Sequence, residues 1–218
     1  MLQSPKERSR RSSQARGRIA RIIGIAETVI IAAVASRSSH LFWMDLEMTG
    51  LDPDRDTILE IATIVTDGEL KVLAEGPVFA IHHSKAELDG MDPWCVEHHG
   101  SSGLTKRCIE SMTTLAEAEK ATLSFARQWC PERTVPLCGN SIHQDRRFLV
   151  RYMPLLNDFL HYRMVDVSSV KELVQRWYPA EFRHFTKKKS HLALDDVRES
   201  IQELAEYRKT FFKLPAAL

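Results

Sequence analysis

Apolar runs and alternating positions predict that the folded part of this chain opens with strands. Residues 41–47 form a short apolar run, and residues 57–66 are rich in β-branched side chains. Residues 70–82 return as a third extended stretch after Asp67-Gly68, a dipeptide that favours a hairpin turn. The pattern therefore predicts three consecutive antiparallel strands.

Helical spacing of apolar residues dominates after this point. We expect helices at 91–99, 114–129, 143–152, after Pro154 up to about 161, 168–177 and about 191–208. Short apolar runs at 135–138 and 163–167 are expected to be buried strands, and 183–190 a basic loop. Antiparallel strands followed by alternating helices and short strands predict an α/β fold. We expect a mixed sheet, with three antiparallel strands first and then short parallel strands, flanked by helices.

Length and composition fit one globular core with an appendage. The chain has 218 residues, of which 44% are hydrophobic and 27% charged, which excludes a wholly disordered chain. Its best apolar run, residues 22–35, contains Glu27 and Thr28 and is too short to span a bilayer. The four cysteines include no C-x-x-C pair, so we expect reduced cysteines in the core rather than a zinc ribbon.

Charge divides the chain into a basic leader, residues 1–40, and a body, residues 41–218. The leader has eight basic and two acidic residues and is rich in Arg and Ser, which is typical of a mitochondrial transit peptide. The alternatives are a disordered or alternatively spliced N-terminus, with the protein in the cytoplasm or nucleus. The body has 22 basic and 27 acidic residues, so summed positive charge cannot hold a polyanion there. Bound divalent cations would fit a phosphate-bearing substrate.

Two carboxylates, Asp45 and Glu47, end the first predicted strand. Side chains two apart on a strand point to the same face, so these acids project together. Two adjacent anions repel one another unless a cation lies between them. Solvated acids at a fraying strand end are the alternative.

Two later segments add chemistry. Asp145 lies in the first turn of a predicted helix, just after the strand end at Gly139, where ligand-binding residues often gather in α/β sheets. The alternative is an acid that only interacts favourably with the helix dipole. His191 lies at the start of the last helix with Asp195 and Asp196 close behind. A neutral histidine can take a proton from water, whereas the two acids could merely help the helix begin.

Together these residues predict a metal site: Asp45, Glu47, Asp145 and Asp196 are four carboxylates, and His191 is a base. Four acids around one point are tolerable only with divalent metal. Two ions, Mg²⁺ or Mn²⁺, roughly 4 Å apart are usual for displacement at phosphorus. The site is therefore expected to hydrolyse a phosphodiester, with Asp195 in a supporting role.

The same residues resemble the DEDDh branch of the 3′-to-5′ exonucleases, and within it the oligoribonuclease family of animal or mitochondrial type. The resemblance implies an RNase H-like fold and runs across nearly all of residues 41–210. Its matching stretches are MDLEMTGLD (44–52), VLAEGP (72–77), WCVEHHGSSGLT (94–105), GNSIHQDRRFL (139–149), HYRMVDVSSVKEL (161–173), RWYP (176–179) and SHLALDD (190–196).

The resemblance implies a substrate and a set of substrate contacts. The substrate would be very short single-stranded RNA, down to dinucleotides, released as 5′-mononucleotides by a homodimer. Leu51 would wedge between two bases, and Trp94 and His99 would line the 3′ base and sugar. The residues implied at the 5′ phosphate are Ser141, Arg163 and Ser168, with Tyr162 reaching in from a second subunit.

Three other functions compete with this one. A related exonuclease could act on longer DNA or RNA, but the acidic body weighs against it. An inactive binding or scaffold protein would usually have lost one of the five residues, and all are present. A glycosidase with Asp45 and Glu47 as its acid pair would need neither the other two carboxylates nor the histidine.

Overall fold

The computed structural model describes residues 37–185 and 192–213. The chain divides into two compact units, Met1–Ser38 and Ser39–Leu218, and the elements from β1 to α9 belong to the second. Most of the basic leader and the segment 186–191 lie outside the described residues. Within the described part, no helix is long and apolar enough to cross a membrane.

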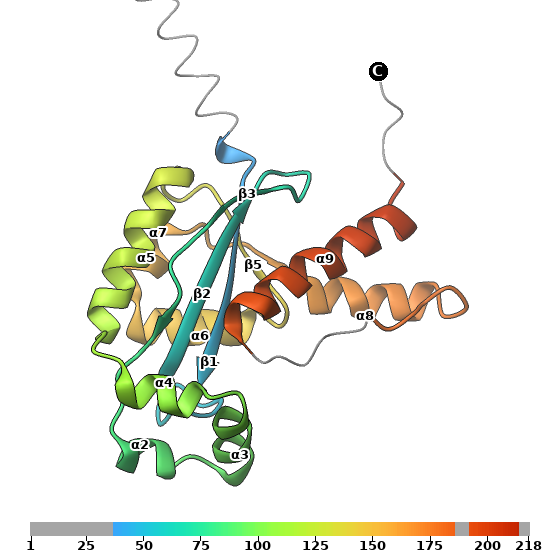
Figure 1. Cartoon of the computed structure of the whole chain (residues 1–218). Coiled ribbons are helices and arrows are strands. Elements are labelled where there is room, and N and C mark those ends of the chain that lie inside the picture. The colour runs from blue at the N-terminus through green and yellow to red at the C-terminus, as the bar shows by residue number, and fades with distance from the viewer. Residues whose placement is uncertain (1–36, 186–191, 214–218) are drawn as a thin grey trace, which may run out of the picture. The chain divides into compact units, whose positions relative to one another are not determined.

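A mixed sheet forms the centre of the second unit (Figure 1). Its strand order is β3-β2-β1-β5-β6, with the short β4 also paired to β2. The pairs of β2 are antiparallel, whereas β1 with β5 and β5 with β6 are parallel, as predicted. The strands are β1 (Leu41–Met48), β2 (Ile58–Thr66), β3 (Val72–Glu75), β4 (Phe79–Ala80), β5 (Leu137–Gly139) and β6 (Met164–Asp166).

The continuous third strand predicted at 70–82 is wrong, because the chain breaks into β3 and β4. Between them lies Gly76, whose N–H donates to the carbonyl of Thr63 at 2.8 Å. A side chain at Gly76 would overlap Thr63 and Phe125. Pro77 follows and has no N–H to offer a ladder. The glycine permits this close approach, and the proline prevents pairing from continuing.

Helices cover both faces of the sheet. The predicted helices are present, but the short α2 and α4 were not predicted. A capping box of Ser84 and Glu87 begins α2, and Gly103 in the left-handed region precedes α4. Helices this short carry too little apolar periodicity to recognise. The bounds are α2 (Lys85–Asp89), α3 (Pro93–Ser101), α4 (Leu104–Glu110), α5 (Leu115–Trp129), α6 (His143–Tyr152), α7 (Pro154–Phe159), α8 (Val167–Trp177) and α9 (Ala193–Phe211).

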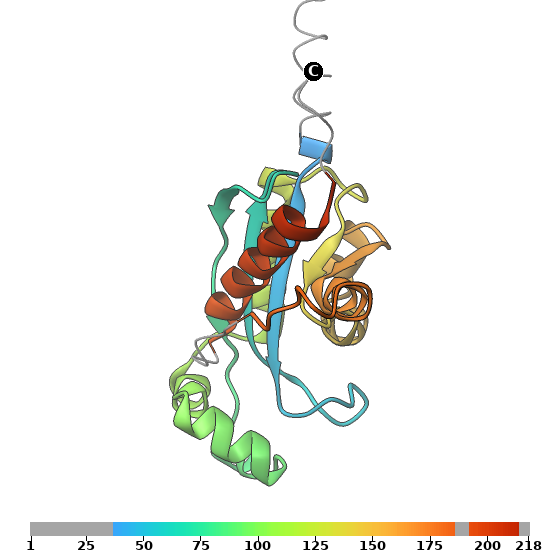
Figure 2. The same ribbon diagram turned by 90° about the vertical axis from the view of Figure 1, so that its right-hand side faces the viewer.

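The alternation of β1 assigns its side chains to two cores. Phe42, Met44 and Leu46 pack into the larger core, together with residues of α5, α6 and α7. Trp43 points the other way, into the core formed with α8 and α9. Figure 2 shows α9 lying across this second face of the sheet. Asp45 and Glu47 share the parity of Trp43 and therefore lie on the α9 face.

A small helical group, α2 to α4, lies at the end of the sheet where β1 finishes and β2 begins (Figure 1). Leu59 joins Leu88, Leu104 and Cys108 in a third apolar cluster that attaches this group to β2. All four cysteines are buried and unbridged. The expectation of structural, reduced cysteines agrees with this arrangement.

Candidate active site

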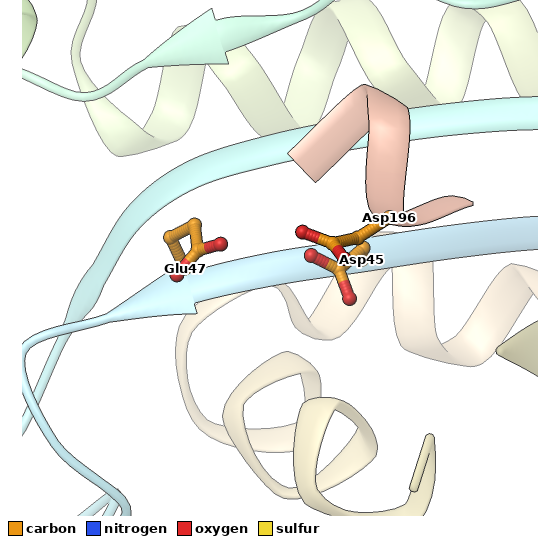
Figure 3. Close-up of side chains that lie close together, drawn as sticks. All are labelled: Asp45, Glu47 and Asp196. Atoms are coloured by element: carbon orange, nitrogen blue, oxygen red, sulfur yellow. The ribbon is translucent and has the colours of Figure 1, made fainter. Parts of the chain in front are cut away.

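Three carboxylates from two elements converge on the α9 face of the sheet. Asp45 and Glu47 project from β1, and Asp196 projects from the first turn of α9. One ligand atom from each lies within 4.8 Å of the others. Figure 3 shows the Asp196 carboxylate beside that of Asp45, with Glu47 further along the strand. We call these three residues the acidic trio.

Burial and mutual repulsion act strongly on Glu47. Burial is the largest cause of a rise in the pKa of Glu47 to about 8, and the charge of Asp196 is the next. Glu60 and Asp145 raise this pKa further, whereas Arg107 lowers it. Without metal the site therefore favours protonated Glu47, and a bound cation would favour its ionised form.

Asp145 lies beside the acidic trio and is not part of it. Its side chain is buried, and its Oδ1 accepts a hydrogen bond from the Leu46 N–H at 2.9 Å. Burial raises the pKa of Asp145 to about 7, and the hydrogen bond from Leu46 opposes the rise. The contact places the first turn of α6 against the end of β1, on the strand that carries Glu47.

Glu60 is a fourth acid on the α9 face, and sequence reasoning missed it. It lies opposite Glu47 in the β1–β2 pair, and its side chain is buried. One carboxylate oxygen accepts from Arg107 at 2.7 Å, and the other accepts from the Ala193 N–H at 3.2 Å. The sequence did contain a signal for it: Glu60 is a charged residue within an otherwise largely apolar strand, which indicates a buried and paired carboxylate.

An open cleft of about 930 Å³ adjoins the carboxylates. It is lined by Glu47, by the turn after β1 and by the start of α3, and it includes Leu51, Trp94 and His99. Leu51 is 64% exposed and Trp94 is 65% exposed, unusual values for large apolar side chains. The three residues expected to contact bases and sugar therefore share one cleft with Glu47.

His99 differs from the other two because it is buried. Its Nε2 lies 2.9 Å from the Met48 carbonyl, which can only accept, so Nε2 carries a proton and donates it. Its Nδ1 lies 3.9 Å from a carboxylate oxygen of Glu47. Burial lowers the pKa of His99, so the ring is favoured in its neutral form. This histidine ties α3 to the end of β1.

Ser141, in the turn after β5, and Ser168, in the first turn of α8, come together although they are 27 positions apart in sequence. The Ser141 N–H donates to the Ser168 hydroxyl at 3.0 Å, and the two hydroxyls lie 3.1 Å apart. Asp166 accepts from the N–H groups of both serines, at 3.0 and 2.9 Å. Ser141 has a φ of 51°, which marks a sharp turn at the end of β5.

Tyr162 and Arg163, the other two residues implied at the 5′ end, lie on the surface, and neither they nor the two serines are among the residues that line the cleft. Tyr162 is 73% exposed and stands against the ring of His161. Arg163 is exposed, and its guanidinium lies 5.6 Å from the centre of the Tyr162 ring. The described part of this chain therefore does not bring them beside Leu51 and Trp94.

The last helix separates its two adjacent acids. Asp195 accepts from Arg198 at 3.0 Å, and Arg198 also pairs with Glu75 of β3. Asp196, one residue further, belongs to the acidic trio. His191, the predicted base, lies outside the described residues, as does the basic run Lys187–Lys189.

The donor set of the acidic trio suits hard divalent cations. Carboxylate oxygens are the ligands that Mg²⁺ and Mn²⁺ prefer. Burial, and after it the charge of Asp196, raises the pKa of Glu47, so this carboxylate is both shielded from water and close to like charge. Asp45, Glu47 and Asp196 could therefore hold such an ion, with Asp145 as a neighbour.

The fold and the acidic site define a class: a metal-dependent nuclease with an RNase H-like fold. Residues 42–204 match the exonuclease family model. Exonuclease I from Methylocaldum szegediense superposes with a TM-score of 0.59 at 20% identity, over 79% of this chain and 41% of the other. The zinc-bound E. coli ExoI–ssDNA complex gives 0.62 at 17% identity, over 79% and 41%. The chain spans about two-fifths of these structures, which share its fold.

Closer relatives narrow the class. The oligoribonuclease of Colwellia psychrerythraea is 55% identical over 83% of this chain and 100% of its own length. That of Pseudomonas aeruginosa is 59% identical over 80% of this chain and 97% of its own length. The chain belongs to the oligoribonuclease family.

Proposed function

We propose that the chain is a metal-dependent 3′-to-5′ exoribonuclease. It degrades very short single-stranded RNA, down to dinucleotides, and releases 5′-mononucleotides. One observation carries this proposal: the acidic trio adjoins, through Glu47, a cleft with exposed apolar side chains in its walls. That arrangement suits a substrate of a few nucleotides held at its ends, in a chain of the oligoribonuclease family.

Two divalent ions, Mg²⁺ or Mn²⁺, would supply an activated water and neutralise charge at the leaving oxygen. Asp45, Glu47 and Asp196 would hold them, and Asp145 would complete the set. His191 would take the proton from the attacking water. A His191→Ala variant that retains the wild-type rate across pH 6–8 would remove that role.

The cleft walls would hold the bases. Leu51 would insert between two bases, and the exposed face of Trp94 would stack on the 3′ base. His99 is buried and held in place by the Met48 carbonyl, and it would meet the sugar where it lines the cleft. Stacking accepts any base, which suits an enzyme that clears fragments of many sequences.

The 5′ end would meet a separate group of residues. Ser141 and Ser168 form a hydroxyl pair at the start of α8, where Asp166 already accepts from their backbone N–H groups, so the two hydroxyls would make the contact with the phosphate. Arg163 would add a charged contact to the 5′ phosphate. Tyr162 is exposed in this chain and would act in the site of a second copy in a homodimer. Closing the 5′ end would limit the length of the substrate.

The test is a length series of end-labelled RNA from two to twenty residues, with Mg²⁺ or with EDTA. We expect fast release of mononucleotides from the dinucleotide, slower turnover of longer chains, and no product with EDTA. Equal turnover of two- and twenty-residue RNA would favour a general exonuclease. A parallel DNA series separates the two sugar types.

We further propose that residues 1–40 direct the protein to mitochondria. The exonuclease family match begins at residue 42, and the leader is basic. A reporter fused to residues 1–40 should enter mitochondria in cells, and the same reporter with the leader arginines replaced by glutamine should not. A cytoplasmic or nuclear reporter would overturn this localisation.

A further inference from the structure

Among the described residues, no side chain at the start of α9 caps its first turn. The residue before the helix is Leu192, which has no side-chain group to accept from the free N–H groups there. Helix starts normally satisfy those groups with Ser, Thr, Asp or Asn. Asp196 belongs to this turn, so an uncapped start would leave a member of the acidic trio on a fraying helix end.

Glu60, on strand β2, supplies the acceptor for the start of α9. One of its oxygens accepts from the Ala193 N–H at 3.2 Å. Both groups are buried, and Glu60 and Ala193 are 133 positions apart. The carboxylate is thus a cap provided by tertiary structure, and it fixes where α9 begins on the sheet.

Arg107 holds the other oxygen of Glu60 at 2.7 Å. The same guanidinium reaches the carbonyl of Ser102, which follows the end of α3, at 3.3 Å. The helix α3 carries Trp94 and His99. A single chain of contacts therefore runs from the wall of the cleft through Arg107 and Glu60 to the helix turn that presents Asp196.

Glu60 differs in these contacts from its neighbour Glu47 across the strand pair. Both carboxylates lie on the α9 face, but each oxygen of Glu60 already has a donor. Glu47 instead faces Asp45, Asp196 and the cleft. Glu47 is therefore free to bind a metal ion, whereas Glu60 is used to position the first turn of α9.

We propose that Glu60 is a positioning residue. Together with Arg107 it holds the first turn of α9 at a fixed place beside β1 and couples that turn to α3. The inference rests on the proposed function for its effect on turnover. Its structural part stands on the contacts alone. Residues that orient ligand side chains typically change metal affinity or activity by about 10- to 100-fold when they are replaced.

The test compares Glu60→Gln with the wild-type full-length chain in three measurements. Amide hydrogen exchange without metal should be faster at residues 193–196, and calorimetric Mg²⁺ affinity should fall by about 10- to 100-fold. The kcat on a dinucleotide should fall by a similar factor, with KM little changed. Arg107→Met should reproduce the losses, and Arg107→Lys should restore part of them because it keeps a charged donor.

The matched control is Glu75→Gln. Glu75 also pairs with α9, through Arg198, which in turn pairs with the Asp195 side chain, but Glu75 is exposed and, among the described contacts, accepts no hydrogen bond from a backbone N–H of the first turn. It should leave exchange at 193–196 and Mg²⁺ affinity unchanged. If Glu60→Gln destabilises the whole fold, Arg107→Met provides the same test from a partly exposed position.

The outcomes separate the two proposals. Wild-type exchange and wild-type Mg²⁺ affinity in both Glu60→Gln and Arg107→Met would overturn the positioning role. Equal effects of Glu75→Gln would also overturn it, because any contact between α9 and the sheet would then serve. Altered exchange and metal affinity in a protein that cleaves no short RNA would support the positioning role and contradict the proposed function.

Discussion

The acidic trio and the apolar walls of the adjoining cleft are neighbours built in opposite ways. The acidic trio is partly buried and stands on a central strand and on a nineteen-residue helix. Leu51 and Trp94 are about two-thirds exposed and stand on a turn and at the start of a short helix. Like charges need a rigid frame because they repel, whereas a stacking surface must stay accessible. The frame therefore lies in the core, and the stacking surface lies at its edge.

The largest expected effect on the rate comes from substitutions in the acidic trio. Asp45→Asn, Glu47→Gln and Asp196→Asn should each lower Mg²⁺-dependent cleavage by at least about 10³-fold, because a metal ion contributes several kcal/mol to transition-state stabilisation. The fold should persist. Removing one charge from a crowded group should hold or raise the melting temperature measured with EDTA.

Steady-state rates on a dinucleotide and thermal melts check both halves of this prediction. A variant that keeps its Mg²⁺-dependent rate is not missing a ligand, and that residue would leave the proposed set. Asp195→Asn is the matched control, since Asp195 pairs with Arg198 at the surface of α9. It should change the rate much less than Asp196→Asn does.

The acidic trio was easier to predict from the sequence than the exposed walls of the cleft. The alternation of Asp45 and Glu47 on one strand follows from a period of two, so their shared face was predictable. Trp94 and Leu51 were expected only because the chain resembles a known family. A single exposed aromatic residue carries no local signal of its role.

The fold shows the same limit. The mixed sheet and the long helices followed from periodicity, but the break at Gly76 depends on a contact with Thr63 and Phe125 that no local pattern contains. Glu60 was missed for a related reason. Its role depends on Arg107 and Ala193, which are 47 and 133 positions away.

The second prediction extends the comparison to the far end of the substrate. Arg163→Ala should slow cleavage of 5′-phosphorylated dinucleotides by about 10- to 150-fold, since a charged hydrogen bond is worth about 1.5–3 kcal/mol. Dinucleotides without the 5′ phosphate should lose little. Competition between the two substrates in one reaction measures the difference, and an equal loss on both would remove Arg163 from the phosphate contact.

The third prediction addresses the accessible wall. Trp94→Ala should raise KM for a dinucleotide by about 5- to 150-fold, because stacking on one base is worth about 1–3 kcal/mol. Trp177 is a matched control on α8, since it is 67% exposed against 65% for Trp94 and does not line the cleft. Trp177→Ala should leave KM unchanged. Similar KM values for both variants would mean that Trp94 does not stack on substrate.

The last prediction concerns pH and returns to Glu47. Burial, followed by the charge of Asp196, raises the pKa of Glu47 from 4.5 to about 8. The folded, metal-free protein therefore keeps a proton that the unfolded chain loses, so the free energy of unfolding should fall as pH rises from about 4.5 to about 8. Added Mg²⁺ should reverse part of this fall, because the ion neutralises the ionised carboxylate.

Melting temperatures from pH 5 to 8 with EDTA, in wild type and Glu47→Gln, isolate this one group. Other titrating groups contribute to both curves, so the informative quantity is the difference between them. Wild type should lose stability relative to Glu47→Gln as pH rises, since glutamine has no proton to give up. Parallel curves would mean that Glu47 has an ordinary pKa. The Glu47 carboxylate would then be more accessible to water, or farther from the charge of Asp196, than its place on β1 beside α9 indicates.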